Sequence, residues 1–259
     1  LKIYMKLGLS AIRCKMEYKI SFLFFVLAVF SYYFGQLGII WVIVHRFKTI
    51  GGWNRGEMAF LYGLFIFSQG ITSLCFNSLN SFEDFIINGD FDRFLIRPLS
   101  PICQILCANF EIASIAHFAL GVTALVFGSF YADICWTIPK VFFLIPVIIG
   151  AVLIQGGIRI LVSSVAFWTI RNRAIVHTVV YSSKEFIHYP ISIYNIWVKM
   201  FLTFIFPLAF INFYPATYFL DKRGETLFHP ILRYFTPVVG VLVFSFGCLF
   251  WKFGTNKYQ

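Results

Sequence analysis

Residues 81–101 read SFEDFIINGDFDRFLIRPLSP, and apolar runs of membrane length flank this stretch at 57–80 and 102–131. Charged side chains crowd into it, although the chain is otherwise poor in charge. A charged side chain is costly inside hydrocarbon, so we predict that the stretch is exposed to water or to a partner protein. Its charged residues are Glu83, Asp84, Asp90, Asp92, Arg93 and Arg97.

The first half of this stretch has the pattern of a short amphipathic helix. Phe82, Phe85 and Ile86 recur at the i, i+3, i+4 spacing of one helix face. Gly89 stands where a glycine commonly ends a helix, and the residue before Pro98 disfavours the helical region. We therefore predict a short helix followed by a turn. A solvated loop without a role of its own is the alternative.

The composition identifies the class of protein. Of 259 residues, 59% are hydrophobic, 20% are aromatic and only 12% are charged, and the mean hydropathy is +0.81. Soluble domains carry about 25% charged residues, so this chain has too little polar surface for a soluble globule. We predict an all-α integral membrane protein. The net charge of +10 comes from Lys and Arg at the ends of apolar runs, which is typical of contact with lipid headgroups rather than nucleic acid.

Six runs reach the roughly 20 apolar residues that a membrane span needs. The segment 1–19 before them carries five cations beside an apolar face, which predicts a helix lying in the membrane interface. The excess of Lys and Arg favours both termini on the cytoplasmic side, although Arg46, Lys48 and Arg55 oppose it. We read the whole chain, 1–259, as one membrane domain. The predicted spans lie near 20–44, 57–80, 102–131, 141–170, 195–219 and 234–252.

Two ionisable residues fall inside predicted spans, where such residues are rare and usually functional. Glu111 and Arg159 lie at similar depth in consecutive, antiparallel spans. We predict that they pair, or that they share a polar pocket with His117. Such a group either lines a translocation path or only fixes helix packing. Gly121, Ala124 and Gly128 offer a small-residue face, and Gly156-Gly157 another, where helices can approach closely.

A resemblance extends this interpretation. Gly89-x-x-Asp92-x-x-Leu95-x-Arg97-Pro98-Leu99 resembles the cytoplasmic coupling segment of ATP-binding-cassette (ABC) type-2 export permeases, in their six-span branch. Pro207, Asn212 and Pro215 resemble the family's broken fifth span, which re-enters at the outer face. Weaker matches run along almost the whole chain: Gly51-Gly52-Trp53…Glu57, Phe167-Trp168, Tyr189-Pro190-Ile191-x-Ile193-Tyr194 and Trp251-x-x-Gly254-x-x-Lys257-Tyr258.

The resemblance implies the permease subunit of an exporter in the cytoplasmic membrane. The 34 phenylalanines of the chain suggest a hydrophobic or amphipathic substrate, although they would equally face lipid. It implies two cytosolic ATPase subunits, which hold ATP and Mg, and a second permease, identical or related. The interfacial helix would be the family's elbow helix, and 81–101 would dock on the ATPase. The docking residues would be Phe82, Glu83, Asp84, Phe85, Gly89, Asp92, Arg93 and Arg97.

The sequence lacks the common catalytic signatures. It contains no GxxxxGK[ST] phosphate loop, no GxSxG elbow and no HExxH metal motif, so we predict no catalytic residues, no metal and no cofactor in this chain. Two alternatives stay open. One is an intramembrane enzyme that uses Glu111, His117 and Arg159, and the other is a carrier that works without ATP.

Overall fold

The computed structural model describes most of the chain from residue 49 onward. The predicted interfacial helix, 1–19, and most of the predicted first span, 20–44, lie outside the described residues. The described residues are 20–21, 23–24, 27–28, 30–32, 34–35, 38, 49–108, 111, 114–222, 224 and 228–258.

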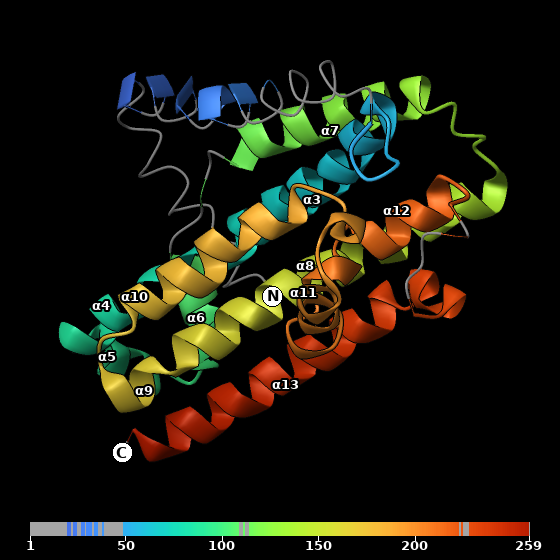
Figure 1. Cartoon of the computed structure of the whole chain (residues 1–259). Coiled ribbons are helices and arrows are strands. Elements are labelled where there is room, and N and C mark those ends of the chain that lie inside the picture. The colour runs from blue at the N-terminus through green and yellow to red at the C-terminus, as the bar shows by residue number, and fades with distance from the viewer. Residues whose placement is uncertain are drawn as a thin grey trace.

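Four long helices form the body of the molecule and run along a common direction in Figure 1: α3 (Arg55–Phe76), α7 (Ser114–Tyr131), α8 (Ile138–Ser164) and α13 (Thr236–Lys257). Beyond Phe76, α3 continues through η1 (Asn77–Ser81) into α4 (Phe82–Ile87). In the described part of the chain, four helical stretches are long and apolar enough to cross a membrane. They are Arg55–Ile87, Ser114–Tyr131, Ile138–Thr169 and Thr236–Lys257.

The helices pack as two pairs that glycines hold close together. In the first pair, α3 and α7, a Cβ added at Gly128 would lie 2.4 Å from the backbone nitrogen of Phe60. In the second pair, α8 and α13, a Cβ at Gly240 would lie 2.6 Å from the carbonyl oxygen of Gly150. Real Cβ atoms do not approach so closely, so only glycine fits at these contacts. The prediction of a small-residue packing face on α7 is confirmed.

The predicted third span, 102–131, is not one helix. The structure divides it into α6 (Pro101–Ala108) and α7, and Glu111 lies outside helix between them. Neither proline nor glycine marks this break in the sequence. The break places the carboxylate of Glu111 beside the polar residues described below rather than on a lipid-facing helix surface.

The segment 171–190 is not the loop that the span count predicts. α10 (Arg173–Val176), the π-helical η2 (His177–Tyr181) and the 3₁₀-helical η3 (Ser182–Ile187) follow one another without interruption, and we call them together the 173–187 helix. Val176, Val180 and Ile187 are buried in the main core. The charged residues Lys184 and Glu185 interrupt the apolar sequence here, so a search for long apolar runs does not identify this helix.

The 173–187 helix extends from one end of the body to the other. At its start, Arg173 bonds to Glu83 and Asp84, which follow the C-terminal end of α3. At its finish, the carbonyl of Ile187 accepts a hydrogen bond from Asn212, which also lies 3.4 Å from the carbonyl of Leu61 near the start of α3. It therefore runs alongside α3, as Figure 1 shows for α10.

The break predicted at Pro207 is confirmed. Ile196–Ile205 and Leu208–Phe219 are bent by 77° relative to each other, because Pro207 cannot donate a backbone hydrogen bond. The bent segment comprises α11 (Ile196–Met200), the π-helical η5 (Phe201–Ile205), η6 (Leu208–Phe210) and α12 (Phe213–Phe219). Pro215 lies in the first turn of α12, where proline is tolerated. Short 3₁₀ helices, η4 (Ile191–Ile193) and η8 (Pro230–Tyr234), precede and follow it.

Candidate functional site

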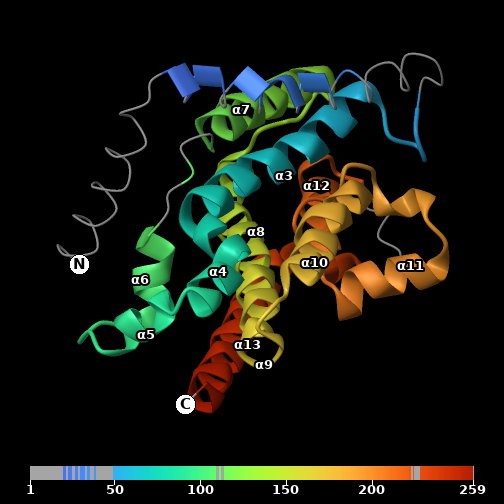
Figure 2. The same ribbon diagram turned by 90° about the vertical axis from the view of Figure 1, so that its left-hand side faces the viewer.

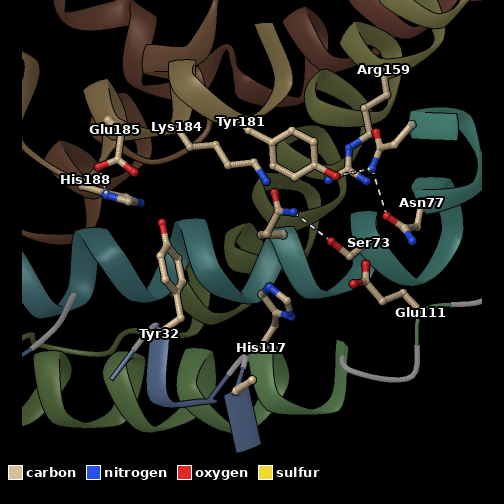
Figure 3. A pocket seen from close by; sticks show the side chains of 13 residues that line it. Tyr32, Ser73, Asn77, Glu111, His117, Arg159, Tyr181, Lys184, Glu185 and His188 are labelled. Carbon is tan, nitrogen blue, oxygen red and sulfur yellow. Dashed lines mark hydrogen bonds and ion pairs between the residues drawn. The ribbon is translucent and has the colours of Figure 1, made fainter. Parts of the chain in front are cut away.

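A polar cavity of about 370 Å³ lies between the helices. Figure 3 shows its side chains converging from several elements, with those of α7 and the N-terminal segment on one side and those of α8 and the 173–187 helix on the other. Glu111, Arg159 and His117 all line it, so the prediction of a shared polar pocket is confirmed. The full lining is Ala28, Tyr32, Gln69, Ser73, Asn77, Asn80, Glu111, His117, Arg159, Tyr181, Lys184, Glu185 and His188.

Gln69 of α3 is the centre of a hydrogen-bond network in this cavity. Its amide orientation follows from its neighbours: the nitrogen donates to Oε1 of Gln155 at 2.6 Å. The oxygen accepts from Arg159 at 2.8 Å, from Lys184 at 3.2 Å and from Ser73 at 2.8 Å. Arg159 is only 2% exposed. One neutral oxygen thus serves two cationic side chains.

This arrangement brings two positive charges close together. The two nitrogen atoms lie within about 6 Å of each other, where like charges repel by about 3 kcal/mol at an effective dielectric constant of about 20. The ring of Tyr181 offsets part of the repulsion, because the Lys184 ammonium lies 4.8 Å from its centre. Asn80 donates to the hydroxyl of Tyr181 at 3.1 Å, so the hydroxyl proton can point toward a ligand.

Two carboxylates, those of Glu111 and Glu185, line the same cavity. Glu185 contacts Nδ1 of His188 at 3.4 Å. His117 approaches the cavity from the α7 side in Figure 3. The cavity therefore holds basic and acidic side chains together.

The sequence pattern does not predict Lys184, Tyr181 and Glu185 as cavity residues, because they lie between the predicted spans 141–170 and 195–219. The signal that identifies the helix is Val176, Val180 and Ile187, which recur at helical spacing. This apolar pattern is short, and charged residues interrupt it, so it does not stand out in the sequence.

The stretch 81–101 forms two short helices, α4 and α5 (Asp90–Leu95), which gather with α9 (Ala166–Thr169) at one end of the molecule (Figures 1 and 2). Gly89 joins α4 to α5 with a left-handed φ of 72°. The prediction of a short helix followed by a turn therefore holds, and a second helix follows the turn.

Two of the predicted docking residues point into the protein. Phe82 is fully buried and packs against Phe167 and Trp251, with ring centres 5.1 and 4.7 Å away. Phe91 joins the same cluster and contacts Tyr258 at 5.0 Å. Phe82 therefore anchors the segment and is not available on its surface.

Glu83 is the other buried member of the predicted docking set. Its carboxylate accepts hydrogen bonds from the backbone N–H groups of Asn172 and Arg173, each at 2.7 Å. It also pairs with the guanidinium of Arg173 at 3.0 Å, and Asp84 pairs with the same guanidinium at 2.8 Å. We call this group of contacts the Glu83–Arg173 latch. It fastens α4 to the first turn of the 173–187 helix.

Three other predicted docking residues are open to a partner. Asp92, Arg93 and Arg97 are exposed, and Arg93 forms a surface ion pair with Asp90 at 3.2 Å. Exposed apolar side chains lie among them, chiefly Ile96, which is 84% exposed. Phe85 is partly buried against Phe94, with ring centres 5.7 Å apart.

In the part of the chain that the structure describes, no three histidine, cysteine, aspartate or glutamate side chains gather as a metal site would require. A family model described as "ABC-2 family transporter protein" matches residues 30–259. No curated protein and no solved structure matches the chain.

Proposed function

Because the chain belongs to the ABC-2 transporter family, we propose that it is the permease subunit of an ATP-driven exporter. Membrane-spanning helices and family together make it a multi-pass membrane protein and a transport component. In this proposal the catalytic ATPase is a separate chain, which holds ATP and Mg, and this chain holds no cofactor. The substrate is hydrophobic or amphipathic.

The observation that carries the proposal is the contrast between the two surfaces of the 81–101 segment. Its inner surface is fixed by the cluster of Phe82, Phe91 and Phe167 and by the Glu83–Arg173 latch. Its outer surface presents Asp92, Arg97 and other exposed groups. A segment built this way can receive a force from a partner and pass it to helices α9, α13 and 173–187.

We propose six crossings of the cytoplasmic membrane, with the first near 20–44 and the 173–187 helix as the fifth. The bent segment 196–219 then re-enters at the outer face, and the 81–101 segment and both termini lie in the cytoplasm. Asn212 supports this topology, since it bonds the bent segment to the end of the 173–187 helix at 2.6 Å. Residues 1–19 would lie in the cytoplasmic interface as the elbow helix.

In the working cycle, two permeases, identical or related, face each other and two ATPase subunits dock beneath them. Closure of the ATPase pair on ATP displaces the 81–101 segments. The latch passes this displacement to the 173–187 helix, which forms one wall of the polar cavity. ATP binding on one chain is thereby linked to the arrangement of helices in another.

Affinity purification of the tagged chain from its native membrane in mild detergent tests this proposal. We expect a Walker-motif ATPase to accompany the wild-type chain in stoichiometric amount, as identified by mass spectrometry. Combined charge reversal by Asp92→Arg and Arg97→Glu should remove the ATPase and any ATPase stimulation. The double variant should lose little thermal stability, because both side chains are exposed and their contacts with Tyr258 and Phe94 are surface interactions of small energy.

Lys252→Glu is the matched control, since it reverses an exposed charge on α13, outside the segment. It should keep the ATPase bound. Absence of any ATPase beside the wild-type chain would contradict the proposal and favour an ATP-independent carrier. Undiminished ATPase recovery with the double variant would show that docking occurs elsewhere.

A further inference from the structure

We propose that an apolar groove between α3, α7 and α8 binds one acyl chain of a membrane lipid. The groove has a volume of about 520 Å³, and no described residue lines both it and the polar cavity. α3 contributes Phe60 and Phe67, α7 contributes side chains from residues 122–130, and α8 contributes Leu144 and Ile148. The inference goes beyond the proposed function, because it requires only that these three helices cross a membrane.

The first argument is the chemistry of the lining. Among the described lining residues, only Ser129 and Trp136 carry a polar side-chain atom, and the others are aliphatic or phenyl groups. The Ser129 hydroxyl donates to the backbone carbonyl of Leu125 at 2.7 Å, so it is already satisfied within α7. A polar ligand would lose its hydrogen bonds to water on entering such a groove, whereas a hydrocarbon chain has none to lose.

The second argument is the length and position of the groove. Its α7 side runs over residues 122–130, which is about 12 Å of helix, and the hydrocarbon of one leaflet is about 15 Å deep. Val122, Val126 and Phe130 are between 47% and 76% exposed, so the groove opens sideways to lipid. Trp136 lines it between the end of α7 and the start of α8, and tryptophan is enriched at the membrane–water boundary. The groove thus matches one acyl chain of one leaflet.

The third argument is that close helix contacts hold part of the lining in place. A Cβ added at Gly63 would lie 2.7 Å from the backbone nitrogen of Leu125, and one added at Gly121 would lie 2.7 Å from the Cα of Phe67. Leu125 and Phe67 both line the groove, so their backbones are fixed by the packing of α3 against α7. A preformed site requires little ordering of the protein when a ligand binds.

A second copy of the chain is the other apolar occupant to consider. An α-helix is about 10–12 Å across, so a 12 Å length of helix occupies roughly 1,000 Å³. The groove, at about 520 Å³, holds about half of that. Phe60 at the groove is fully buried, so an occupant has to be thin enough to reach it. A single file of methylene groups meets this requirement and a helix does not.

Photolabelling of the purified full-length chain tests the inference. The chain is placed in phosphatidylcholine nanodiscs that contain a small share of phosphatidylcholine with a diazirine on one acyl chain. After irradiation and digestion, mass spectrometry locates the adducts. We expect adducts to concentrate on the groove residues of α7 and α8, well above those on the exposed apolar face of α13, which includes Val241.

A variant that fills the groove sharpens the test. Val126→Trp places an indole in the groove, and exclusion of two methylene groups of the ligand should lower the labelling of Leu144 and Ile148 about tenfold. Val241→Trp is the matched control, because Val241 is 55% exposed and Val126 is 50% exposed, and Val241 is not among the lining residues. It should leave the labelling of Leu144 and Ile148 unchanged.

Three results would overturn the inference. Equal labelling of the groove and of α13 in the wild-type chain would show that lipid meets the groove only as bulk hydrocarbon, and this comparison holds even if Val126→Trp fails to fold. Undiminished labelling in Val126→Trp would place the acyl chain elsewhere. Cross-links between two copies of the chain through α7, in place of lipid adducts, would identify a second copy as the occupant. The outcome is independent of whether an ATPase accompanies the chain.

Discussion

The central helices α3 and α8 each have two unlike faces. On one face, glycine contacts bring the backbones of α3 and α7, and of α8 and α13, almost into touch. On the other face, α3 presents Gln69 and α8 presents Arg159 to an open polar cavity. Figure 2 shows the two pairs inclined to each other. Each pair is therefore rigid within itself, and the polar contact between the pairs is where relative movement costs least.

The largest effect is expected where the close contact within a pair is broken. Gly128→Ala places a Cβ 2.4 Å from the backbone nitrogen of Phe60, and backbone atoms cannot move aside as a flexible side chain can. We expect a loss of about 3 kcal/mol, at the upper end for overpacking, measured by thermal unfolding in detergent. Gly35→Ala is the control, because its Cβ would meet no atom within 4 Å. Equal melting temperatures for the two variants would show that the pair is not tightly packed.

A smaller effect is expected in the cavity. Gln69→Leu removes the oxygen shared by Arg159 and Lys184 and should destabilise the protein by about 2 kcal/mol, since buried donors lose their acceptor. Gln69→Glu is the informative counterpart. Its carboxylate should keep or raise the melting temperature, because it still accepts the hydrogen bonds of Arg159 and Lys184. Unchanged melting of Gln69→Leu would mean that the cavity behaves as ordinary solvent-exposed surface.

The smallest effect is expected at the latch, which joins α4 to the start of the 173–187 helix. Glu83→Gln keeps the shape but weakens the bonds to the N–H groups of Asn172 and Arg173, for a loss of about 1 kcal/mol. Hydrogen exchange should rise at the first amides of the 173–187 helix. Asp84→Asn should have less effect, because its side chain is 46% exposed and surface pairs contribute little. Equal protection in both variants would exclude the latch as the junction.

The sequence predicted the features that depend on local pattern, namely several membrane-spanning helices and one break. The spans near 57–80, 141–170 and 234–252 correspond to helices able to cross a membrane, and the break at Pro207 follows from proline chemistry. The cavity that contains Glu111, His117 and Arg159 could be predicted, because charged side chains within apolar runs require polar neighbours.

The 173–187 helix and the buried position of Glu83 could not be predicted, because both depend on tertiary contacts. The 173–187 helix escapes an apolar-run criterion because Lys184 and Glu185 interrupt it, and their burial is tolerated only where Gln69, Tyr181 and His188 surround them. The inward direction of Glu83 is equally invisible, since its donors lie 89 and 90 residues away along the chain. Amphipathic spacing identifies a helix face but not which charged residue turns inward.

The π-helical turn at His177–Tyr181 stands between the latch at Arg173 and the ammonium of Lys184. Such a turn closes i→i+5 hydrogen bonds and so winds more residues into a turn than an α-helix does. Rewinding it by one residue would rotate everything beyond it by about 100°. A small displacement of Arg173 along the helix axis can therefore rotate the later part of the helix and move Lys184 away from Gln69. The π-helical turn would thus convert an axial displacement at Arg173 into a rotation of Lys184 about the helix axis.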